Sequence, residues 1–436
     1  MARIYPVLST DTRICVCTVG LPARGKTYIA EKVRRYLTWL SIPTKTFNVG
    51  NYRRRLSIPF PLAEFFNPKN AVGEEARRKA AEAALTDMMI WFKQESGIVG
   101  ILDATNSTKK RRQWIRSVCE ENNVLCMFVE SICNDEKIIM NNIMAVKLSS
   151  PDYRGQDSEK SASDFLKRIK YYEQAYQPLD DEDFSYVKLI DVGKKVIINR
   201  IQDYLQSKIV YYLMNLHIKP RSIWLSRHGE SEFNLHGIIG GDSSLSSRGL
   251  HYAKELPNIL QKSLGDAPLI VWTSTMKRTI ETAKYLPYKK LEWKALDELS
   301  AGIFDGMSYE ELKVLFPDEL NSRQDDKFNY RYSGGESYRD VIARLEPVIM
   351  ELERQGNVLI ISHQAILRCI YGYYHDLDQE VFPFVDIPLH TVLKLTQAPY
   401  STFEERLTTT IPAVSTHRPK KLKSSGNQSE NSLNPA

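Results

Sequence analysis

The chain has 436 residues, of which 42% are hydrophobic and 26% are charged, a balance typical of a globular protein with more than one core. Its net charge of +6 is small for this length, and the basic residues are scattered among acidic ones, so we expect no nucleic-acid partner. The sequence has no apolar run near the ~18 residues that span a bilayer and no secretory pattern at its start, so we expect no membrane association.

Short apolar runs alternate with helical patterns along the chain, which predicts an α/β protein built on parallel sheets. In the first half we expect strands at Ile14–Val19, Ile98–Asp103, Val124–Ser131 and Tyr186–Ile190, and helices at Lys26–Leu40, Glu74–Phe92, Lys109–Glu121, Asp164–Tyr176 and Val196–Asn215. In the second half we expect strands at Ser222–Ser226, Leu269–Thr273 and Val358–Ser362, and helices at Leu250–Leu264, Thr275–Leu286, Tyr338–Gln355 and Gln364–Tyr374.

The pattern is interrupted between the two halves, at Leu216–Arg221, where Pro220 ends a helical run. We therefore predict a first domain over residues 1–219 and a second over 220–407, followed by a polar, disordered tail over 408–436. All eight histidines, from His217 to His417, lie in the second half, so chemistry in the first half cannot use imidazole. Six cysteines without a regular spacing indicate free thiols in a reducing compartment and predict a cytoplasmic protein.

A phosphate-binding loop follows the first expected strand. The residues match G-x-x-x-x-G-K-[ST] at every fixed position, and they are Gly20, Leu21, Pro22, Ala23, Arg24, Gly25, Lys26 and Thr27. Backbone amides of such a loop surround the phosphates of a nucleotide, while the helix N-terminus adds positive potential. Lys26 would bridge the β- and γ-phosphates and the Thr27 hydroxyl would reach Mg²⁺, so the pattern predicts binding of ATP with Mg²⁺.

An acceptor for the phosphoryl group also has to be held in the first domain. Asp103 ends a buried strand and could bind Mg²⁺ or orient an acceptor hydroxyl, although an Asp at this place is often only a turn former. Several basic residues could surround a phosphorylated acceptor if they converge, and they are Arg53, Arg54, Arg77, Arg78, Arg111, Lys147 and Arg168. Each alone is more often a solvated surface charge.

A histidine nucleophile is indicated in the second domain. Arg227, His228 and Gly229 follow a strand, a pattern that resembles the histidine phosphatase and phosphoglycerate mutase superfamily. His228 would attack phosphorus and become phosphohistidine. Arg227, Arg278 and His363 would neutralise the phosphoryl oxygens, and Glu298 would protonate the leaving alkoxide, so this half needs no metal or cofactor.

Both signatures on one chain, in this order, resemble the 6-phosphofructo-2-kinase/fructose-2,6-bisphosphatase family over about residues 14–417. The matching segments are GLPARGKTYI at 20–29, FNVGNYRR at 47–54, DATN at 103–106, VESIC at 129–133, SPDY at 150–153, YYLMN at 211–215, RHGESE at 227–232, GGESY at 334–338 and PLHTVLKL at 388–395. The resemblance implies a P-loop, adenylate-kinase-like parallel sheet followed by a histidine phosphatase-like α/β domain.

The resemblance also implies two opposed activities, in which fructose 6-phosphate and ATP give fructose 2,6-bisphosphate and the second half removes the 2-phosphate, in a cytosolic homodimer. Residues implied to contact fructose 6-phosphate are Arg53, Arg77, Thr105, Arg111, Lys147, Arg168 and Tyr172. Further implied residues of the kinase site are Asp103 and Cys133, with the segment Asn142–Lys147 on the nucleotide. Residues implied to contact the bisphosphate, besides Arg227, are Asn234, Gly240, Tyr309, Arg323, Lys327, Tyr338, Gln364 and Arg368.

Some positions depart from the family pattern. Ser226 and Ser362 stand where many members have cysteine, Ile303–Gly306 replaces a V-C-E-E run, and Leu56–Leu62 diverges after the Arg53/Arg54 pair. Two other functions stay open. One half could be catalytically weak, because rates depend on sub-ångström positioning, or the protein could be a non-catalytic sugar-phosphate sensor. The presence of Lys26, His228 and Glu298 disfavours the sensor.

Overall fold

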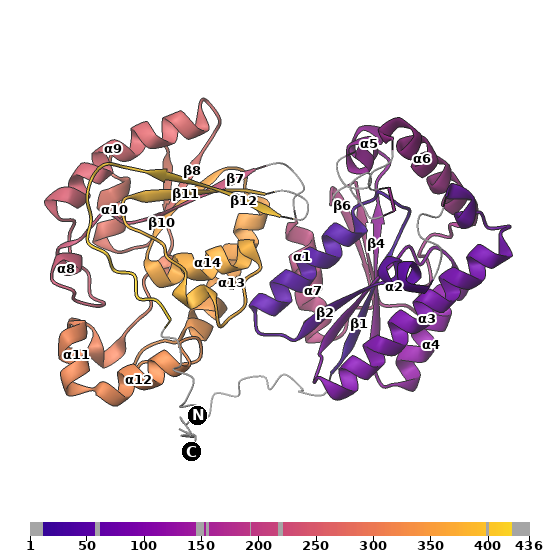
Figure 1. Ribbon diagram of the computed structural model, residues 1–436, viewed down its shortest axis with the longest axis horizontal. Coiled ribbons are helices and arrows are strands. Elements are labelled where there is room, and N and C mark those ends of the chain that lie inside the picture. The colour runs from indigo at the N-terminus through magenta and orange to yellow at the C-terminus, as the bar shows by residue number, and fades with distance from the viewer. Residues whose placement is uncertain are drawn as a thin grey trace, which may run out of the picture. The chain divides into compact units, whose positions relative to one another are not determined.

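The structure is a computed structural model that describes residues 12–56, 62–144, 152–153, 157–191, 193–216, 221–397 and 401–420. Its residues divide into two compact units, each with its own sheet (Figure 1). The first unit comprises Met1–Arg221 with Pro347–Gly356 and Thr396–Phe403, and the second comprises the other residues. Residues 217–220, where we expected the domain boundary, lie outside the described part of the chain.

The first unit is built on a six-stranded sheet in the order β2-β3-β1-β4-β5-β6. Its strands are β1 (Ile14–Val19), β2 (Thr44–Asn48), β3 (Val99–Asp103), β4 (Leu125–Ile132), β5 (Tyr186–Ile190) and β6 (Lys195–Asn199). Neighbours from β2 to β5 are parallel, and β6 is antiparallel to β5. Every residue of β1 and β3 is buried, as expected for central parallel strands covered on both faces.

Helices cover both faces of this sheet. They are α1 (Lys26–Trp39), α2 (Val49–Leu56), α3 (Ala71–Gln94), α4 (Lys109–Glu121), α5 (Glu136–Asn142), α6 (Ser158–Ala175) and α7 (Tyr204–Asn215), with a 3₁₀ turn at Ala63–Phe66. In Figure 1, α1 and α7 lie on one face while α3 and α4 lie on the other. Because β1 sits between β3 and β4, the strand order reverses there, and the carboxyl ends of these strands meet at the place where such sheets form ligand crevices.

The expected helix over Val196–Asn215 is wrong. The structure has strand β6 over Lys195–Asn199, and helix α7 begins only at Tyr204. Three consecutive β-branched residues, Val196 to Ile198, favour an extended edge strand paired with β5. Asp203 then starts the helix, since its carboxylate accepts hydrogen bonds from the amides of Leu205 and Gln206. Strand β2 was also missing from the sequence prediction.

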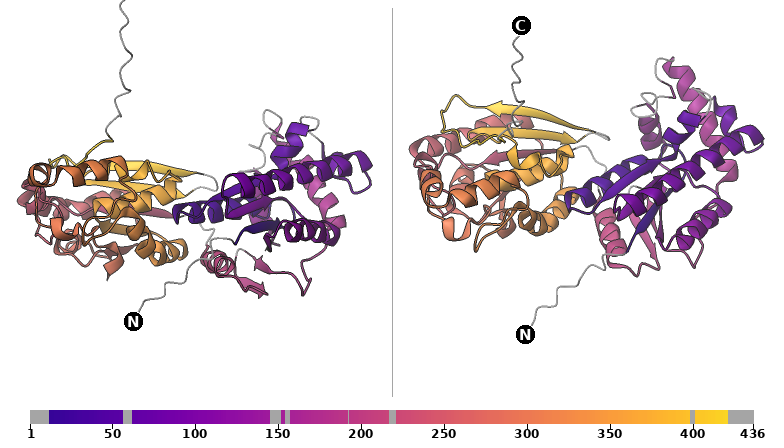
Figure 2. Two further views of the ribbon diagram at one scale, coloured as in Figure 1. Left: turned by 90° about the horizontal axis from the view of Figure 1, so that it is seen from below. Right: turned by 60° about the horizontal axis from the view of Figure 1, so that its bottom comes forward.

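The second unit has a six-stranded sheet in the order β12-β11-β7-β10-β8-β9. Its strands are β7 (Ser222–Arg227), β8 (Ile270–Thr273), β9 (Lys289–Glu292), β10 (Val358–Ser362), β11 (Thr391–Gln397) and β12 (Thr402–Thr408). The pairs β7/β10, β10/β8 and β8/β9 are parallel. Figure 2 shows β11 and β12, in yellow, at one edge of this sheet.

The helices of the second unit again cover both faces of its sheet, with α9 and α10 on one face and α13 and α14 on the other (Figure 1). They are α8 (Glu232–Leu235), α9 (Ser247–Leu264), α10 (Lys277–Ala283), α11 (Tyr309–Leu315), α12 (Pro317–Asp325), α13 (Tyr338–Arg354) and α14 (Gln364–His375). Short 3₁₀ turns occur at Lys294–Leu296, Gly302–Phe304 and Phe382–Phe384. The carboxyl ends of β7 and β10 position the site. Arg227 is the last residue of β7 and Ser362 the last of β10, and the two residues lie in register.

All six cysteines are free thiols, as the sequence predicted. Within the described ranges, we find no helix with both the length and the apolar character needed to cross a bilayer. The same part of the chain holds no group of three or more His, Cys, Asp or Glu side chains suited to a metal ion.

Candidate active sites

The phosphate loop of the first unit has a backbone that only glycine accepts at two positions. Gly20 has φ +132°, and a Cβ on it would lie 2.5 Å from the Ser131 carbonyl oxygen. Gly25 caps α1 with φ +81°. Both angles lie in the region that side chains disfavour, so glycine allows the chain to turn tightly from β1 into α1. The residues at the start of α1, Gly25 to Thr27, line the pocket, and a helix N-terminus at such a place suits an anion.

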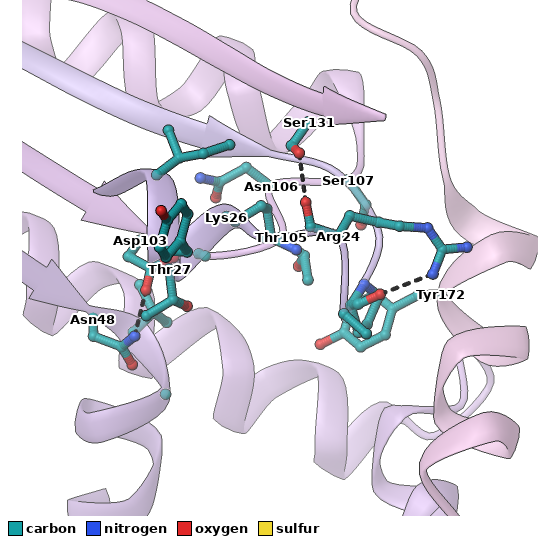
Figure 3. Close-up of a pocket in the computed structure, with 18 of the residues that line it drawn as sticks. Arg24, Lys26, Thr27, Asn48, Asp103, Thr105, Asn106, Ser107, Ser131 and Tyr172 are labelled. Carbon is teal, nitrogen blue, oxygen red and sulfur yellow. Dashed lines mark hydrogen bonds between the residues drawn. The ribbon is translucent and has the colours of Figure 1, made fainter. Parts of the chain in front are cut away.

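The polar residues at the ends of β1 and β3 are interconnected. Asp103 is 3% exposed, and its carboxylate accepts hydrogen bonds from the Asn48 amide at 2.6 Å and the Thr18 hydroxyl at 3.3 Å. In Figure 3, Asp103, Asn48 and Thr27 lie together on one side of the pocket. The Lys26 ammonium donates to the Leu21 carbonyl oxygen at 2.6 Å, within its own loop. Oxygen ligands next to a loop lysine are the donor set that Mg²⁺ with a nucleotide requires, so Thr27 and Asp103 fit it.

A cavity of about 1020 Å³ opens over these residues (Figure 3). This volume is at the upper end of small-molecule sites and can hold two ligands side by side. The predicted residues that line it are Pro22–Thr27, Arg53, Arg77, Asp103, Thr105, Arg111, Cys133, Asn142, Arg168 and Tyr172. Gly20 and Leu21 are not among its lining residues, and Lys147 lies outside the described residues.

Asp152 is the main site residue that sequence reasoning missed. Both of its carboxylate oxygens lie 2.6 Å from the Arg53 Nη2 atom, and Arg54 and Arg168 approach it at 3.3 and 3.4 Å. Although burial opposes ionisation, the nearby arginines hold the pKa of Asp152 below its ordinary value. Its place in the SPDY segment was the available sequence signal. A single acidic residue does not predict contacts with arginines that are more than a hundred residues apart from one another in the sequence.

Several guanidinium groups in this cavity keep unused donors. Within the described residues, the Arg53 Nη1, Arg111 Nε and Arg168 Nε atoms are buried without a hydrogen-bond partner. Burial lowers the pKa of Arg111, as it does that of Arg53. Buried donors without partners are costly, so these arginines are arranged to bind an anion that enters the cavity.

The remaining predicted residues of this site lie around the loop and the arginines. The Arg77 guanidinium donates to the Phe65 carbonyl at 2.5 Å, and Arg111 donates to the Arg77 carbonyl at 3.3 Å. Asn142, at the end of α5, donates to the Ala23 carbonyl of the phosphate loop at 3.1 Å. Cys133 follows β4 and is 5% exposed, compatible either with a site residue or with a small buried hydrophobe.

His228 and His363 form the centre of the second site. Both are nearly or fully buried, and their ring centroids lie 5.2 Å apart. His228 Nδ1 lies 2.7 Å from the carbonyl oxygen of Gly229. Because a carbonyl only accepts, this contact places the proton on Nδ1 and leaves the Nε2 lone pair available. Burial, followed by Arg278 and Arg227, holds the pKa of His228 well below its ordinary value.

His363 is held by a hydroxyl network. Its Nε2 atom lies 2.8 Å from the Ser274 hydroxyl, which also contacts the Thr279 hydroxyl at 2.8 Å. Its Nδ1 atom is buried without a partner in the described residues, so it is a donor or acceptor for a ligand. Burial and then Arg278 hold the pKa of His363 well below its ordinary value. Sequence reasoning missed Ser274, which lies just after β8.

Two arginines and one glutamate complete the centre. Burial lowers the pKa of Arg227 to about 10 while Glu298 opposes this change, so the guanidinium stays charged at neutral pH. Arg278 donates to the Gly241 carbonyl at 2.8 Å, and Glu298 likewise counters the effect of burial on its pKa. Glu298 accepts a hydrogen bond from the Ala365 amide, at the start of α14, at 3.3 Å. The structure thus brings the residues of the predicted centre together.

A second group of predicted residues surrounds three basic side chains, Arg323, Lys327 and Arg368. Lys327 donates to the Pro383 carbonyl at 2.7 Å, and Arg368 donates to the Tyr338 hydroxyl at 3.3 Å. The Arg323 guanidinium lies 6.0 Å from the centroid of the Tyr309 ring. Burial first, then Arg368, Arg323 and Arg418, lowers the pKa of Lys327 to about 5.

The other predicted residues of the second site are local supports. Asn234 forms a reciprocal cap with Ser231 at the start of α8, and Gly240 lies against the Asp305 side chain. The Gln364 amide nitrogen is buried without a partner in the described residues. Ser226 and Ser362, where we noted a departure from the family pattern, are buried, and their hydroxyls bond Tyr252 and the Leu296 carbonyl, each at 2.7 Å.

The two units therefore define a protein with a nucleotide-type phosphate loop on one sheet and a phosphohistidine-type centre on another. A 6-phosphofructo-2-kinase family model matches residues 4–220, and a histidine phosphatase superfamily (branch 1) model matches residues 223–409. The chain belongs to the 6-phosphofructo-2-kinase/fructose-2,6-bisphosphatase family, as the sequence resemblance predicted.

Individual relatives carry two kinds of name. A Saccharomyces cerevisiae protein named fructose-2,6-bisphosphatase is 52% identical, over 98% of this chain and 96% of its own length. 6-Phosphofructo-2-kinase/fructose-2,6-bisphosphatase 1 is 51% identical in both Rattus norvegicus and Homo sapiens, over 94% of this chain and 88% of theirs. Among solved structures, a putative α-ribazole-5′-P phosphatase from Escherichia coli matches at 19% identity and a TM-score of 0.40, over 45% of this chain and all of that one.

Proposed function

We propose that this protein phosphorylates fructose 6-phosphate at C2 with ATP and removes the same phosphate from fructose 2,6-bisphosphate through a phosphohistidine. The observation that carries the proposal is that each unit holds its own set of buried, charged groups. The first set surrounds a phosphate loop and contains no histidine, while the second surrounds a buried histidine pair. Two different phosphoryl-transfer sites on one chain suit two opposed reactions on one sugar phosphate.

In the kinase half, the chain acts mainly by positioning and by charge. The loop amides and Lys26 hold the nucleotide phosphates, and Thr27 and Asp103 would hold Mg²⁺, which would supply positive charge to neutralise the phosphates. Arg53, Arg77, Arg111 and Arg168, with Thr105 and Tyr172, orient the sugar phosphate so that its C2 hydroxyl faces the γ-phosphate. Asp103 can also orient that hydroxyl. Asn142 supports the loop through its bond to the Ala23 carbonyl.

In the phosphatase half, the neutral His228 ring attacks the 2-phosphate with Nε2, since Nδ1–H is already engaged by the Gly229 carbonyl. The low pKa of the ring keeps this nucleophile unprotonated at neutral pH. Arg227, Arg278 and His363 stabilise the phosphoryl oxygens as they gain charge. Glu298 protonates the departing C2 oxygen and then takes a proton from the water that hydrolyses phosphohistidine. This half uses no metal or cofactor in our proposal.

One specific observation supports an alternative in which one half is weak. The yeast relative at 52% identity is named only as the bisphosphatase, whereas the vertebrate relatives carry both names. The kinase cavity is nevertheless lined by the full set of predicted side chains apart from Gly20, Leu21 and Lys147. Lys26, His228 and Glu298 are present, which disfavours a non-catalytic sensor. The cytoplasmic location rests on the free thiols, and the homodimer rests on the family.

The test is steady-state assay of both reactions on wild type, Lys26→Met and His228→Ala. We expect Lys26→Met to lose kinase turnover and keep bisphosphatase turnover, and His228→Ala to do the reverse and to form no phosphoenzyme from 2-³²P-labelled fructose 2,6-bisphosphate. A His228→Ala protein that still becomes labelled refutes the nucleophile. Equal loss of both activities in either variant shows that the sites are not separate, and a wild type active in one direction only supports the alternative.

A further inference from the structure

The segment 409–420, which follows β12, is tied to the phosphatase site at successive residues. We call it the C-terminal segment. Composition placed it in a polar tail, but in the structure the His390 ring contacts the Ile411 carbonyl at 3.2 Å and the Val414 amide donates to Glu230 at 2.9 Å. The Arg227 guanidinium donates to the Thr416 hydroxyl at 2.6 Å. Arg227 and Glu230, which precede and follow His228 in the sequence, therefore both bind this segment.

The anchor at Glu230 is strong. Glu230 is fully buried, and its carboxylate also accepts hydrogen bonds from Arg248 at 2.7 and 2.8 Å and from Ser246 at 2.7 Å. A buried carboxylate held by several donors fixes the amide that it accepts from, so Val414 has a set position. From there, four more residues of backbone bring Arg418 to a defined place.

Arg418 reaches the cation group formed by Arg323, Lys327 and Arg368. Its guanidinium lies 3.6 Å from the centroid of the Tyr309 ring, the ring that Arg323 also approaches. Arg418 also contributes, after burial, Arg368 and Arg323, to lowering the pKa of Lys327. Among the residues that the structure describes, no carboxylate forms an ion pair with Arg323, Lys327, Arg368 or Arg418. Three arginine charges close to a lysine whose pKa is about 5 lack a counter-ion, and a bound anion relieves the cost of that arrangement.

We propose that Arg418 binds the second phosphate of the bisphosphate, the one that is not transferred to His228, and that the C-terminal segment is part of the substrate site. This proposal rests on the proposed bisphosphatase function. Arg418 is the exposed member of the group, while Lys327 and Arg368 are buried. Stacking on Tyr309 holds its guanidinium in place, so that it can contact a phosphate bound by Arg323, Lys327 and Arg368.

The experiment compares wild type, Arg418→Gln, Arg418→Lys and Arg406→Gln. Arg406 is an exposed arginine on β12 and serves as a control for the loss of one positive charge. With fructose 2,6-bisphosphate, we expect Arg418→Gln to raise KM about tenfold or more, because a charge-assisted bond is lost, and to leave kcat within about twofold. Arg418→Lys should have a KM between those of wild type and Arg418→Gln, and Arg406→Gln should have the KM and kcat of wild type.

A second substrate, p-nitrophenyl phosphate, has a single phosphate and no partner for Arg418. We expect wild type and Arg418→Gln to hydrolyse it equally. If Arg418→Gln loses activity equally on both substrates, the proposal is overturned. A higher kcat of Arg418→Gln on the bisphosphate also overturns it, and would mean that the C-terminal segment obstructs the site. A wild type that hydrolyses p-nitrophenyl phosphate but not the bisphosphate refutes the proposed function itself, and this proposal with it.

Discussion

The imidazole rings of His228 and His363 lie with their centroids 5.2 Å apart and their planes at 53°, and both are buried and feel the charges of Arg278 and Arg227. Burial and these like charges hold both pKa values well below the ordinary value of a histidine. The pair is therefore neutral at pH 7, with one ring able to act as a nucleophile and the other able to donate to a phosphoryl oxygen. Several measurable consequences depend on this arrangement.

Removing the charge of Arg278 should raise the pKa of both histidines. In Arg278→Gln, one like charge is lost, and we expect each imidazole to titrate at a higher pH than in wild type. Imidazole nitrogen shifts in NMR titrations measure this directly and do not depend on the substrate. Arg406→Gln is the control and should leave both titrations unchanged. Identical titrations in Arg278→Gln and wild type would contradict the electrostatic cause.

The buried histidines should also make the second unit acid-sensitive. The folded-state pKa values of His228, His363 and His390 lie below the ordinary value, in each case chiefly through burial. Below about pH 6.5 the unfolded chain binds protons that the folded chain does not, so the free energy of unfolding falls as pH falls, by up to about 1.4 kcal/mol per pH unit for each histidine.

Urea unfolding at pH 7.5 and 5.5, followed by tryptophan fluorescence, measures this loss. We expect a lower unfolding midpoint at pH 5.5, and a smaller difference between the two pH values in His363→Gln than in wild type. His251→Gln, which alters an exposed histidine on α9, should keep the wild-type difference. A midpoint that is the same at both pH values would mean that the buried rings accept protons without cost.

Asp152 should stabilise the first unit when no sugar phosphate is bound. Asp152→Asn removes the carboxylate that faces Arg53, Arg54 and Arg168, and it leaves the buried Arg53 charge uncompensated. Breaking a buried pair in this way typically costs about 3–5 kcal/mol. An anionic ligand replaces the missing charge, so fructose 6-phosphate should raise the melting temperature of Asp152→Asn more than that of wild type.

Thermal unfolding with and without fructose 6-phosphate measures both the loss of stability and the rise in melting temperature that the ligand causes. The control is Asp87→Asn, which neutralises an exposed carboxylate that accepts a hydrogen bond from the Tyr52 hydroxyl at 2.9 Å. It should change neither the melting temperature nor the ligand response by a comparable amount. If Asp152→Asn melts like wild type and responds equally to the ligand, Asp152 does not organise the arginines.

A methyl group at Gly249 should damage the phosphatase site alone. A Cβ there would lie 2.0 Å from the Glu230 carbonyl oxygen, a backbone atom two residues after His228. Alanine favours a helix over glycine by only about 1 kcal/mol, which cannot offset such a clash. The loop that carries His228 must move, and a shift of about 1 Å can reduce turnover about a hundredfold.

The assay compares Gly249→Ala with Gly356→Ala, because a Cβ on Gly356 meets no atom within 4 Å. We expect Gly249→Ala to lose bisphosphatase turnover and keep kinase turnover, and Gly356→Ala to keep both. Full bisphosphatase activity in Gly249→Ala would show that the loop tolerates displacement.

The amino-acid sequence by itself determined the chemistry of each half. The phosphate loop, the Arg227–His228 pair and the alternation of strands and helices are local patterns, and local patterns reflect the backbone and side-chain demands of a few neighbouring residues. For this reason the central strands were predicted at or within a few residues of their observed positions. The helix over Val196–Asn215 was wrong because the β-branched residues Val196 to Ile198 favour an extended chain, which pairs with β5 at the edge of the sheet.

Only the tertiary structure decided which distant charges meet. Asp152 gathers Arg53 and Arg168, Ser274 holds His363, and the C-terminal segment reaches Arg227, although each pair is far apart or unremarkable in the sequence. Such contacts depend on how the sheets and helices pack, and burial then sets the pKa values and the unused donors that the chemistry needs. A sequence pattern does not show whether a single polar residue is buried, and so these contacts could not be predicted from the sequence.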